Sequence, residues 1–319
     1  MKEFKHHDAQ TVEEASALLA EYRGKAAVIA GGTDILGVIK SDIIPGYPEA
    51  LVNIKTIAGL DSIKEEGGVL KIGTLATIED IAANATVQGG YNVLSEAALS
   101  VAAALIRSMG TLGGNLAQSV RCWYYRYPNE VGGRFLCFRK GGALCYAVPG
   151  DNRYHSILGG QVCFAVQPGD TSFALSALNA TIVTNKRSIP IDSFYVVLGN
   201  VLAQDEFIVE VHVPTPAAGT RQAYTKFRYR RAIDWAITSV ASCITTSGGA
   251  VSDARITLGG VAPVPWRSTA AENLIKGKAI TEALAVQAGT AAVADAFALS
   301  GNAYKIQVAK TLVKRAILG

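Results

Sequence analysis

The chain has 319 residues, half of them hydrophobic, and a formal net charge of +4. This length suffices for two or three domains with buried cores. The basic residues are scattered and do not form a dense patch with interleaved aromatics, so we exclude nucleic-acid binding. No apolar run could span a bilayer, and no apolar segment follows the basic start, so we expect neither membrane insertion nor a signal peptide. The expected class is a cytoplasmic enzyme or enzyme subunit.

The first unit of the chain is predicted to be a helix, a strand, a glycine turn and a second helix. A capping box at Thr11 to Glu14 starts the first helix, and the apolar run 25–30 predicts a buried strand. The turn Gly31-Gly32-Thr33-Asp34 follows, and helical spacing resumes at Ile35. Glycines let backbone amides approach a ligand, and consecutive N–H groups there can bind a pyrophosphate. A plain strand–helix turn is the alternative, and the lack of G-x-G-x-x-G gives no support for a Rossmann site.

A second glycine pair follows about 80 residues later in the sequence. Before it we expect a strand at 50–54, a hairpin with its turn at 66–68, and helices at 77–83 and 91–109. The pair itself lies in Thr111 to Gln118, among polar residues. Two glycine turns in one domain favour a single long phosphate-bearing ligand, and a dinucleotide such as FAD has that length.

Four of the five cysteines lie between residues 121 and 170, with the spacing C-x14-C-x7-C-x17-C. This segment is rich in glycine, tyrosine and arginine and lacks an ordinary core element, so something other than burial must fix it. Three interpretations compete: free buried thiols, disulfides, and a metal or iron–sulfur site. The absence of a secretory segment disfavours disulfides, and the absence of C-x2-C favours a cluster over zinc. Spacing alone leaves the three open.

The remainder of the chain is predicted to alternate strands and helices around one boundary. We expect a turn at Gln167 to Asp170, a helix at 171–178, a strand at 180–184 and a loop from Asp192. In the strand 206–213, Phe207, Val209, Val211 and Val213 should share one face. The segment 214–219 is the best domain boundary, followed by strands to Val261 with a hairpin at 248–249 and helices at 272–276, 280–298 and 302–317. Cys243 is expected to be a buried apolar residue, and the four histidines form no metal set.

Four motifs occur in the order of a known family: Ala30 to Asp34, Thr111 to Asn115, Ala165 to Asp170, and Thr257 to Arg267. On these, and over essentially its whole length, the chain resembles the FAD-binding medium subunit of molybdenum hydroxylases. That family includes xanthine dehydrogenase, carbon monoxide dehydrogenase, aldehyde oxidoreductase and 4-hydroxybenzoyl-CoA reductase. The resemblance implies an α+β fold, in which a vanillyl-alcohol-oxidase-type (PCMH-type) FAD-binding domain of two α+β subdomains precedes a smaller α+β domain. The implied ranges are 1–216 (subdomains about 1–56 and 57–216, insertion 121–163) and 217–319.

The resemblance also implies which residues bind FAD. They are Ala27, Val28, Ile29, Ala30, Gly31, Gly32, Thr33, Asp34, Ile35, Thr111, Gly113, Gly114, Asn115, Ala117, Asp170, Ile208 and Lys226. The usual family turn H-P-S-D is here Gln167-Pro-Gly-Asp170, which keeps the aspartate and puts any role of the missing His and Ser in doubt.

A subset of the family, similar to the 4-hydroxybenzoyl-CoA reductase β subunit, carries a four-cysteine insertion with an extra [4Fe–4S] cluster. Cys122, Cys137, Cys145 and Cys163 fit that pattern in order. The implied activity is electron transfer within a molybdenum oxidoreductase. Its partners would be a large subunit with the molybdenum cofactor and a small subunit with two [2Fe–2S] clusters, in a heterotrimer or a dimer of heterotrimers. No catalytic acid, base or nucleophile is expected in this chain, and a periplasmic location would require an export signal on a partner.

Two other classes of protein stay open from the sequence. A stand-alone flavin oxidase or reductase would need its own substrate base and would work without partners. A zinc-stabilised binding protein would be colourless and free of flavin.

Overall fold

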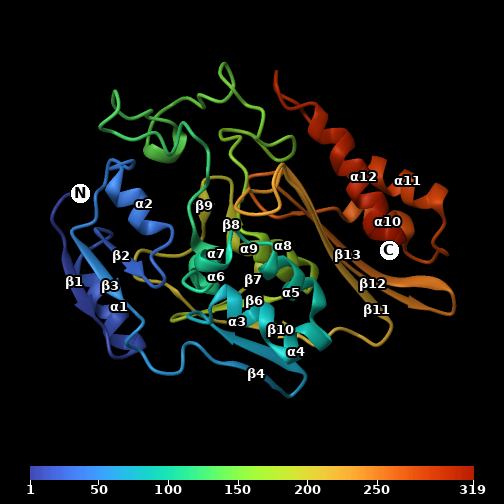
Figure 1. Cartoon of the computed structure of the whole chain (residues 1–319), viewed down its shortest axis with the longest axis horizontal. Coiled ribbons are helices and arrows are strands. Elements are labelled where there is room, and N and C mark those ends of the chain that lie inside the picture. Colours follow the sequence, from blue (N-terminus) through green and yellow to red (C-terminus); the bar gives the residue numbers. More distant parts are fainter.

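The computed structural model describes the whole chain from Met1 to Gly319. Three sheets with their helices follow one another along the long axis, from the blue N-terminal part to the red C-terminal part (Figure 1). The first two α+β units and the smaller third one confirm the predicted fold class.

The first unit is a parallel sheet of three strands in the order β1-β3-β2. Its elements are β1 Lys5–Asp8, α1 Val12–Glu21, β2 Ala26–Ile29, α2 Ile35–Lys40 and β3 Ala50–Asn53. The predicted cap forms, since the Glu14 N–H donates to Thr11 Oγ1 at 3.1 Å. The Glu14 carboxylate accepts from the Gln10 N–H at 2.7 Å, one residue earlier than in a regular capping box.

The second unit is an antiparallel sheet in the order β4-β5-β10-β6-β7, with short helices against it. Its strands are β4 Ile63–Glu66, β5 Val69–Gly73, β6 Thr181–Thr184, β7 Ser188–Pro190 and β10 Ile208–Pro214. Its helices are α3 Ile78–Ala83, α4 Ala85–Gly90, α5 Asn92–Leu99, α6 Ala104–Arg107, α7 Leu112–Ala117, α8 Asp170–Ala177 and α9 Ile191–Phe194. Every residue of α8 is buried, so this helix is the centre of the main core. The expected hairpin is confirmed as β4–β5.

The predicted helix over 91–109 is wrong, because the chain breaks after α5. Ala102 has a φ of 43°, and α6 begins only at Ala104. The break is stabilised from outside the helix, since Lys226 Nζ and Arg228 Nη1 donate to the Ser100 carbonyl at 3.1 and 2.7 Å. Cations commonly satisfy the last carbonyls of a helix.

Two further expectations in this unit are corrected. A β-bulge between Ile208 and Glu210 interrupts the alternation of β10, so Ile208 joins Val211 in the main core while Phe207 packs on the N-terminal core. The loop expected from Asp192 is the short helix α9. Its Asp192 carboxylate accepts from Ser176 and Arg255.

The third unit is an antiparallel sheet in the order β11-β12-β13-β14 covered by three helices. Its elements are β11 Thr220–Phe227, β12 Thr238–Ser247, β13 Ala250–Gly259, β14 Trp266–Arg267, α10 Thr269–Ile275, α11 Glu282–Ala291 and α12 Tyr304–Leu318. The hairpin expected at 248–249 joins β12 to β13. The helix predicted to reach residue 298 ends at Ala291, and the chain then turns so that the Phe297 N–H reaches the Ile157 carbonyl at 2.7 Å.

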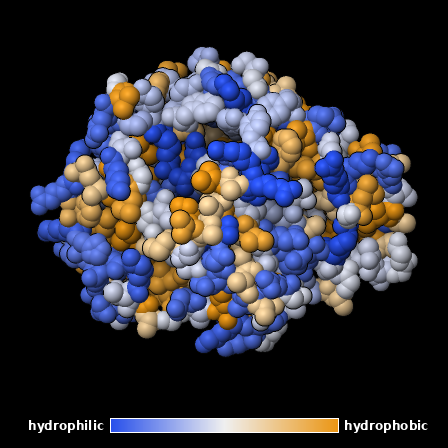
Figure 2. All heavy atoms as spheres, viewed as in Figure 1, coloured by the Kyte–Doolittle hydropathy of each residue, from blue (hydrophilic) through white to orange (hydrophobic).

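Residues 118–169 contain no strand and one short 3₁₀ turn, η1 Phe138–Lys140. This segment runs in green across the top of Figure 1, between the blue unit and the orange strands. A small ribbon, β8 Tyr195–Val196 with β9 Gly199–Asn200, lies outside the large sheets. The face seen in Figure 2 is mostly hydrophilic, with apolar patches between polar groups.

Candidate functional site

The first glycine turn joins β2 to α2 and can contain only glycine at its start. A Cβ on Gly31 would lie 1.8 Å from the Met109 carbonyl oxygen, and Gly32 has a φ of +72°. The turn therefore packs directly on the backbone at Met109 and Gly110, just before the second glycine turn.

The second turn starts α7, and Thr111 caps it by accepting from the Gly114 N–H at 3.3 Å. A Cβ on Gly113 would lie 1.9 Å from Thr74 Oγ1, and the Gly113 N–H donates to the Thr74 carbonyl at 2.9 Å. The turn is thus fixed against the chain that follows β5. Gly31 packs against Met109 and Gly110, which directly precede this second turn, so the two turns predicted from sequence meet in space.

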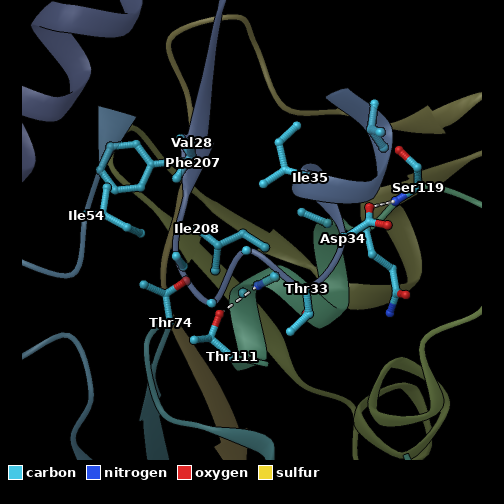
Figure 3. Close-up of a pocket in the computed structure, with 18 of the residues that line it drawn as sticks. Val28, Thr33, Asp34, Ile35, Ile54, Thr74, Thr111, Ser119, Phe207 and Ile208 are labelled. Carbon is cyan, nitrogen blue, oxygen red and sulfur yellow. Dashed lines mark hydrogen bonds between the residues drawn. The ribbon is translucent and has the colours of Figure 1, made fainter. Parts of the chain in front are cut away.

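The two turns open on one cleft of about 280 Å³ (Figure 3). The sequence-predicted residues that line it are Val28, Ala30, Gly31, Gly32, Thr33, Asp34, Ile35, Thr111, Gly113, Gly114, Ala117 and Ile208. Ala27 and Ile29 do not line it, because strand residues alternate between faces. Asn115 lines an adjoining cavity of about 340 Å³, which also touches Thr33 and Thr111. A third cavity of about 350 Å³ meets the same turns at Gly31 and Thr111.

Asp170 and Lys226 lie outside the cleft as a buried ion pair with an N–O distance of 2.7 Å. The Tyr224 hydroxyl donates to the same carboxylate at 2.6 Å. Burial, followed by the Asp170 charge, raises the pKa of Tyr224 well above its ordinary value. This arrangement connects α8 to β11, and the predicted contact of these two residues with a cofactor stays a prediction.

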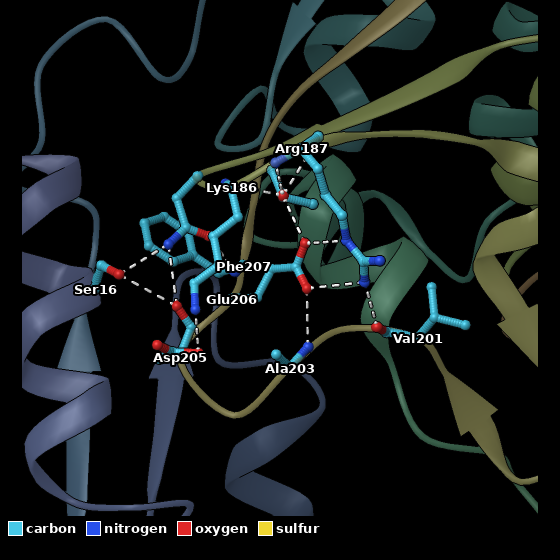
Figure 4. Close-up of polar contacts among 10 residues, drawn as sticks. Ser16, Lys186, Arg187, Val201, Ala203, Asp205, Glu206 and Phe207 are labelled. Carbon is cyan, nitrogen blue, oxygen red and sulfur yellow. Dashed lines mark hydrogen bonds and ion pairs between the residues drawn. The ribbon is translucent and has the colours of Figure 1, made fainter.

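Sequence reasoning missed several residues of the cleft wall, among them Ile54, Thr74, Tyr125, Leu202, Glu206 and Phe207. Phe207 and Glu206 are placed by the polar network in Figure 4. The Glu206 carboxylate accepts from Arg187 Nε, Thr184 Oγ1 and the Ala203 N–H at 2.8–2.9 Å. Burial alone would raise the pKa of Glu206, but Arg187 and the other donors lower it to about 2. No sequence pattern marks this network, because its members come from separate loops.

Asp34 connects the first glycine turn to the cysteine segment. Its carboxylate pairs with Arg121 and with Arg126, the latter at 2.5 Å, and accepts from the Ser119 N–H at 2.8 Å. Burial alone would raise the pKa of Asp34, but the two guanidinium charges and the backbone donor hold it below its ordinary value. Arg121 Nε is buried without a hydrogen-bond partner, and Arg121 lines the adjoining cavity that contains Asn115.

The four predicted cysteines lie together around one small, mostly apolar cavity. Cys122, Cys137, Cys145 and Cys163 all line it, and its free volume is about 20 Å³. All four are free thiols, and burial raises the pKa of Cys122 to about 11. No group of three or more His, Cys, Asp or Glu side chains is placed to hold a single metal ion. Cys243 packs against the main core, where burial raises its pKa to about 12.

Arg139 and His155 contact two of the thiols, and two buried lysines contact the chain beside them. Arg139 Nε donates to Cys163 Sγ at 3.2 Å, and His155 Nε2 lies 3.2 Å from Cys122 Sγ. Lys140 is buried and donates to the Tyr125 carbonyl, while Lys305 donates to three carbonyls, including that of His155 at 2.9 Å. None of these four residues forms an ion pair with Asp or Glu. The sequence predicts no metal set among the four histidines, and it does not indicate this contact of His155 with Cys122.

Comparison with known proteins agrees with this description of a long, phosphate-compatible cleft between two α+β units. Residues 2–216 match the FAD binding domain in molybdopterin dehydrogenase, and residues 222–319 match the CO dehydrogenase flavoprotein C-terminal domain. The chain is 35% identical to the aldehyde oxidoreductase FAD-binding subunit PaoB of Escherichia coli K12 over 85% of its own length and 86% of that protein. It is 32% identical to the carbon monoxide dehydrogenase medium chain of Hydrogenophaga pseudoflava, over 98% and 96% of the two chains.

Solved structures show the same likeness. A chain of carbon monoxide dehydrogenase from Hydrogenophaga pseudoflava superimposes with a TM-score of 0.80 at 30% identity, covering 99% of this chain and 96% of that one. A chain of quinoline 2-oxidoreductase from Pseudomonas putida 86 shares the fold, with a TM-score of 0.77 at 23% identity and coverage of 100% and 97%.

The fold and the glycine cleft therefore define a flavin-nucleotide-binding protein. More narrowly, the chain belongs to the family of FAD-binding medium subunits of multi-subunit molybdenum oxidoreductases, which includes those of carbon monoxide dehydrogenase and aldehyde oxidoreductase. None of its helices is both long enough and apolar enough to span a membrane.

Proposed function

We propose that this chain passes electrons between partner redox centres and an external acceptor or donor, using FAD held in the glycine cleft and a [4Fe–4S] cluster held by Cys122, Cys137, Cys145 and Cys163. The observation that carries the flavin part is the meeting of two glycine turns on one cleft with adjoining cavities. An elongated dinucleotide needs such a connected space, and the close packing at Gly31 and Gly113 holds the two turns together at its edge.

FAD would supply the exchange between paired and single electrons, and the residues of this chain would supply its placement and electrostatics. The glycine turns would hold the diphosphate, with Thr111 and with Arg121, which lines the adjoining cavity, as further donors. The apolar wall at Ile35, Ile54 and Phe207 would exclude water from one end of the ligand. No acid–base or nucleophilic set in the cleft is required for this role.

Three observations support the cluster. Four thiols line one cavity, Arg139 Nε donates to one sulfur while His155 Nε2 lies 3.2 Å from another, and the buried Lys140 has no carboxylate partner. Four thiolates around iron would carry negative charge, which such an environment stabilises. A single zinc ion requires all four sulfurs about 2.3 Å from one point, and these thiols do not form such a set.

The cysteine cavity constrains how a cluster could bind. Its free space is about 20 Å³, so the loops must move apart to accept an iron–sulfur core. Burial raises the pKa of the Cys122 thiol to about 11, so iron binding must displace a proton that is harder to remove than that of an exposed cysteine.

The proposed partners are a large subunit with a molybdenum cofactor and a small subunit with two [2Fe–2S] clusters, in a heterotrimer or a dimer of heterotrimers. The solved Hydrogenophaga pseudoflava enzyme is named as one lacking the Mo-pyranopterin moiety of its molybdenum cofactor, which supports a molybdenum partner here. We further propose that the chain divides at about residue 216, with subdomains 1–56 and 57–216. The predicted compartment is the cytoplasm, or the periplasm if a partner carries the export signal.

The alternative is a stand-alone flavin oxidase or reductase, and co-purification separates the two. We expect a tagged chain, produced together with the products of its neighbouring genes, to carry a large and a small subunit with it. Isolation of the chain alone, with turnover of an organic substrate by that chain, would contradict the subunit role and favour the alternative.

A further inference from the structure

We propose that FAD binding in the glycine cleft and occupancy of the four-thiol cavity are thermodynamically coupled through Asp34, Arg121 and Arg126. This inference rests on the proposed function, because it needs both groups to bind. It predicts that loss of the cluster weakens the hold on FAD, so the iron site regulates retention of the flavin.

The first step is the position of Asp34. It belongs to the first glycine turn and lines both the main cleft and the adjoining cavity that contains Asn115. Its partners Arg121, Arg126 and Ser119 all belong to the entry of the cysteine segment. A change in the conformation of residues 119–126 therefore alters the contacts that hold Asp34, and with it the first glycine turn.

The second step is the position of Cys122 within the same entry. Cys122 directly follows Arg121, and its carbonyl accepts from the Arg126 N–H at 2.9 Å, closing a turn that contains Tyr125. Tyr125 lines both the main cleft and the thiol cavity. It also lines a further cavity of about 130 Å³ that shares Ser119 with the cleft and Arg139 with the thiol cavity. The entry of the segment thus supplies a thiol to one site, a wall residue to both sites, and two guanidinium groups that pair with Asp34.

The third step is that the two sites prefer the same arrangement of this turn. Residues 118–169 have almost no regular structure, so a cluster on four widely spaced cysteines would fix a segment that backbone hydrogen bonding alone holds weakly. Without iron, only hydrogen bonds and ion pairs would hold the entry of the segment, so Arg121 and Arg126 would fix Asp34 less firmly. A ligand that orders a segment needed by a second ligand raises the affinity for that ligand.

The test is FAD affinity of the full-length, flavin-free chain, measured anaerobically by flavin absorbance with and without iron in the cysteine site. We expect the wild-type Kd to be at least about fivefold lower with iron, at the lower end of ordinary coupling. Arg126→Met should bring the ratio close to one, because Arg126 lines neither site but connects them. Arg134→Met is the matched control, since Arg134 pairs in the same way with Asp42, which lines neither site, and it should keep the wild-type ratio.

A wild-type ratio near one, with FAD and iron both bound, overturns the coupling and leaves the proposed function standing. An unchanged ratio in Arg126→Met overturns the proposed route. A chain that never takes up iron under reconstitution removes the proposed cluster and the coupling together. If Arg126→Met does not fold, Arg126→Lys keeps the charge but cannot reproduce the guanidinium bonds to Asp34 and to the Val120 and Ser119 carbonyls, and its ratio must fall below that of the wild type.

Discussion

At Gly31 a single added carbon decides whether the cleft can form. A Cβ there would sit 1.8 Å from the Met109 carbonyl oxygen, and backbone cannot give way as a flexible side chain can. We expect Gly31→Ala to separate the two glycine turns and to raise the Kd for FAD at least about tenfold, a loss of about 1.4 kcal/mol. Gly46→Ala is the control, since a Cβ at Gly46 meets nothing within 4 Å. FAD titration of both variants checks this, and equal affinities would contradict the described packing of the turns.

Glu206 gives a prediction that depends on pH. Its folded-state pKa of about 2 lies below the ordinary value of about 4.3, so its contribution is present above that value and is lost as pH falls toward 2. Glu206→Gln should lower the free energy of unfolding at pH 7 by about 1–3 kcal/mol, because Arg187 loses its charged partner and the other donors lose a carboxylate oxygen. The difference from the wild type should shrink at pH 3. Denaturant unfolding at both pH values measures it, and a constant difference would show that the charge is not responsible.

The residues that line the cleft could be predicted from sequence where a glycine turn fixes the path of the backbone. Gly31 and Gly32 fall on the cleft because the chain turns there between β2 and α2, and Gly113 and Gly114 do so because they lie in the first turn of α7. Ala27 and Ile29 were included with the turn, but their side of β2 faces away. His155 could not be placed, because its contact with Cys122 spans 33 residues through irregular chain.

At the scale of elements, the cysteine segment carries the sharpest prediction. Cys137→Ser should reduce iron from about four atoms per chain to below one, because three thiolates cannot complete the ligand set of the proposed cluster. Cys243→Ser should leave iron unchanged and lower stability by about 1–2 kcal/mol, because that thiol packs against the main core. Iron analysis and thermal unfolding of both variants separate the two roles. Equal iron in the Cys137→Ser chain would exclude Cys137 as a ligand.

Elements were predictable when their pattern was local. The strand–turn–helix at 25–39, the hairpin β4–β5 and the hairpin at 248–249 form as their residues indicate. The break after α5 was not predictable, since the Ala-rich run favours one helix and the donors to Ser100 come from β11 and the residue after it, over 120 positions away. The bulge in β10 was also not predictable, because neighbouring residues of this part of the chain pack into two different hydrophobic cores.

At the scale of the whole molecule, the cysteine segment ties its two ends together. Asp34 binds the start of the segment, while Asn302 and Lys305 of the C-terminal part donate to carbonyls at residues 154–156. The N-terminal unit and the C-terminal helices therefore both depend on a segment with little structure of its own. This arrangement explains why one group bound among the four cysteines would affect the entire chain.

The cofactor content of the chain purified without oxygen tests the central claim most directly. The proposed function predicts about one FAD, four iron atoms and four acid-labile sulfides per chain, with flavin absorption bands on a broad brown background. Flavin without iron or sulfide, even after anaerobic reconstitution, would contradict the cluster and leave the flavin subunit. A chain that contains neither and binds neither would contradict the account as a whole.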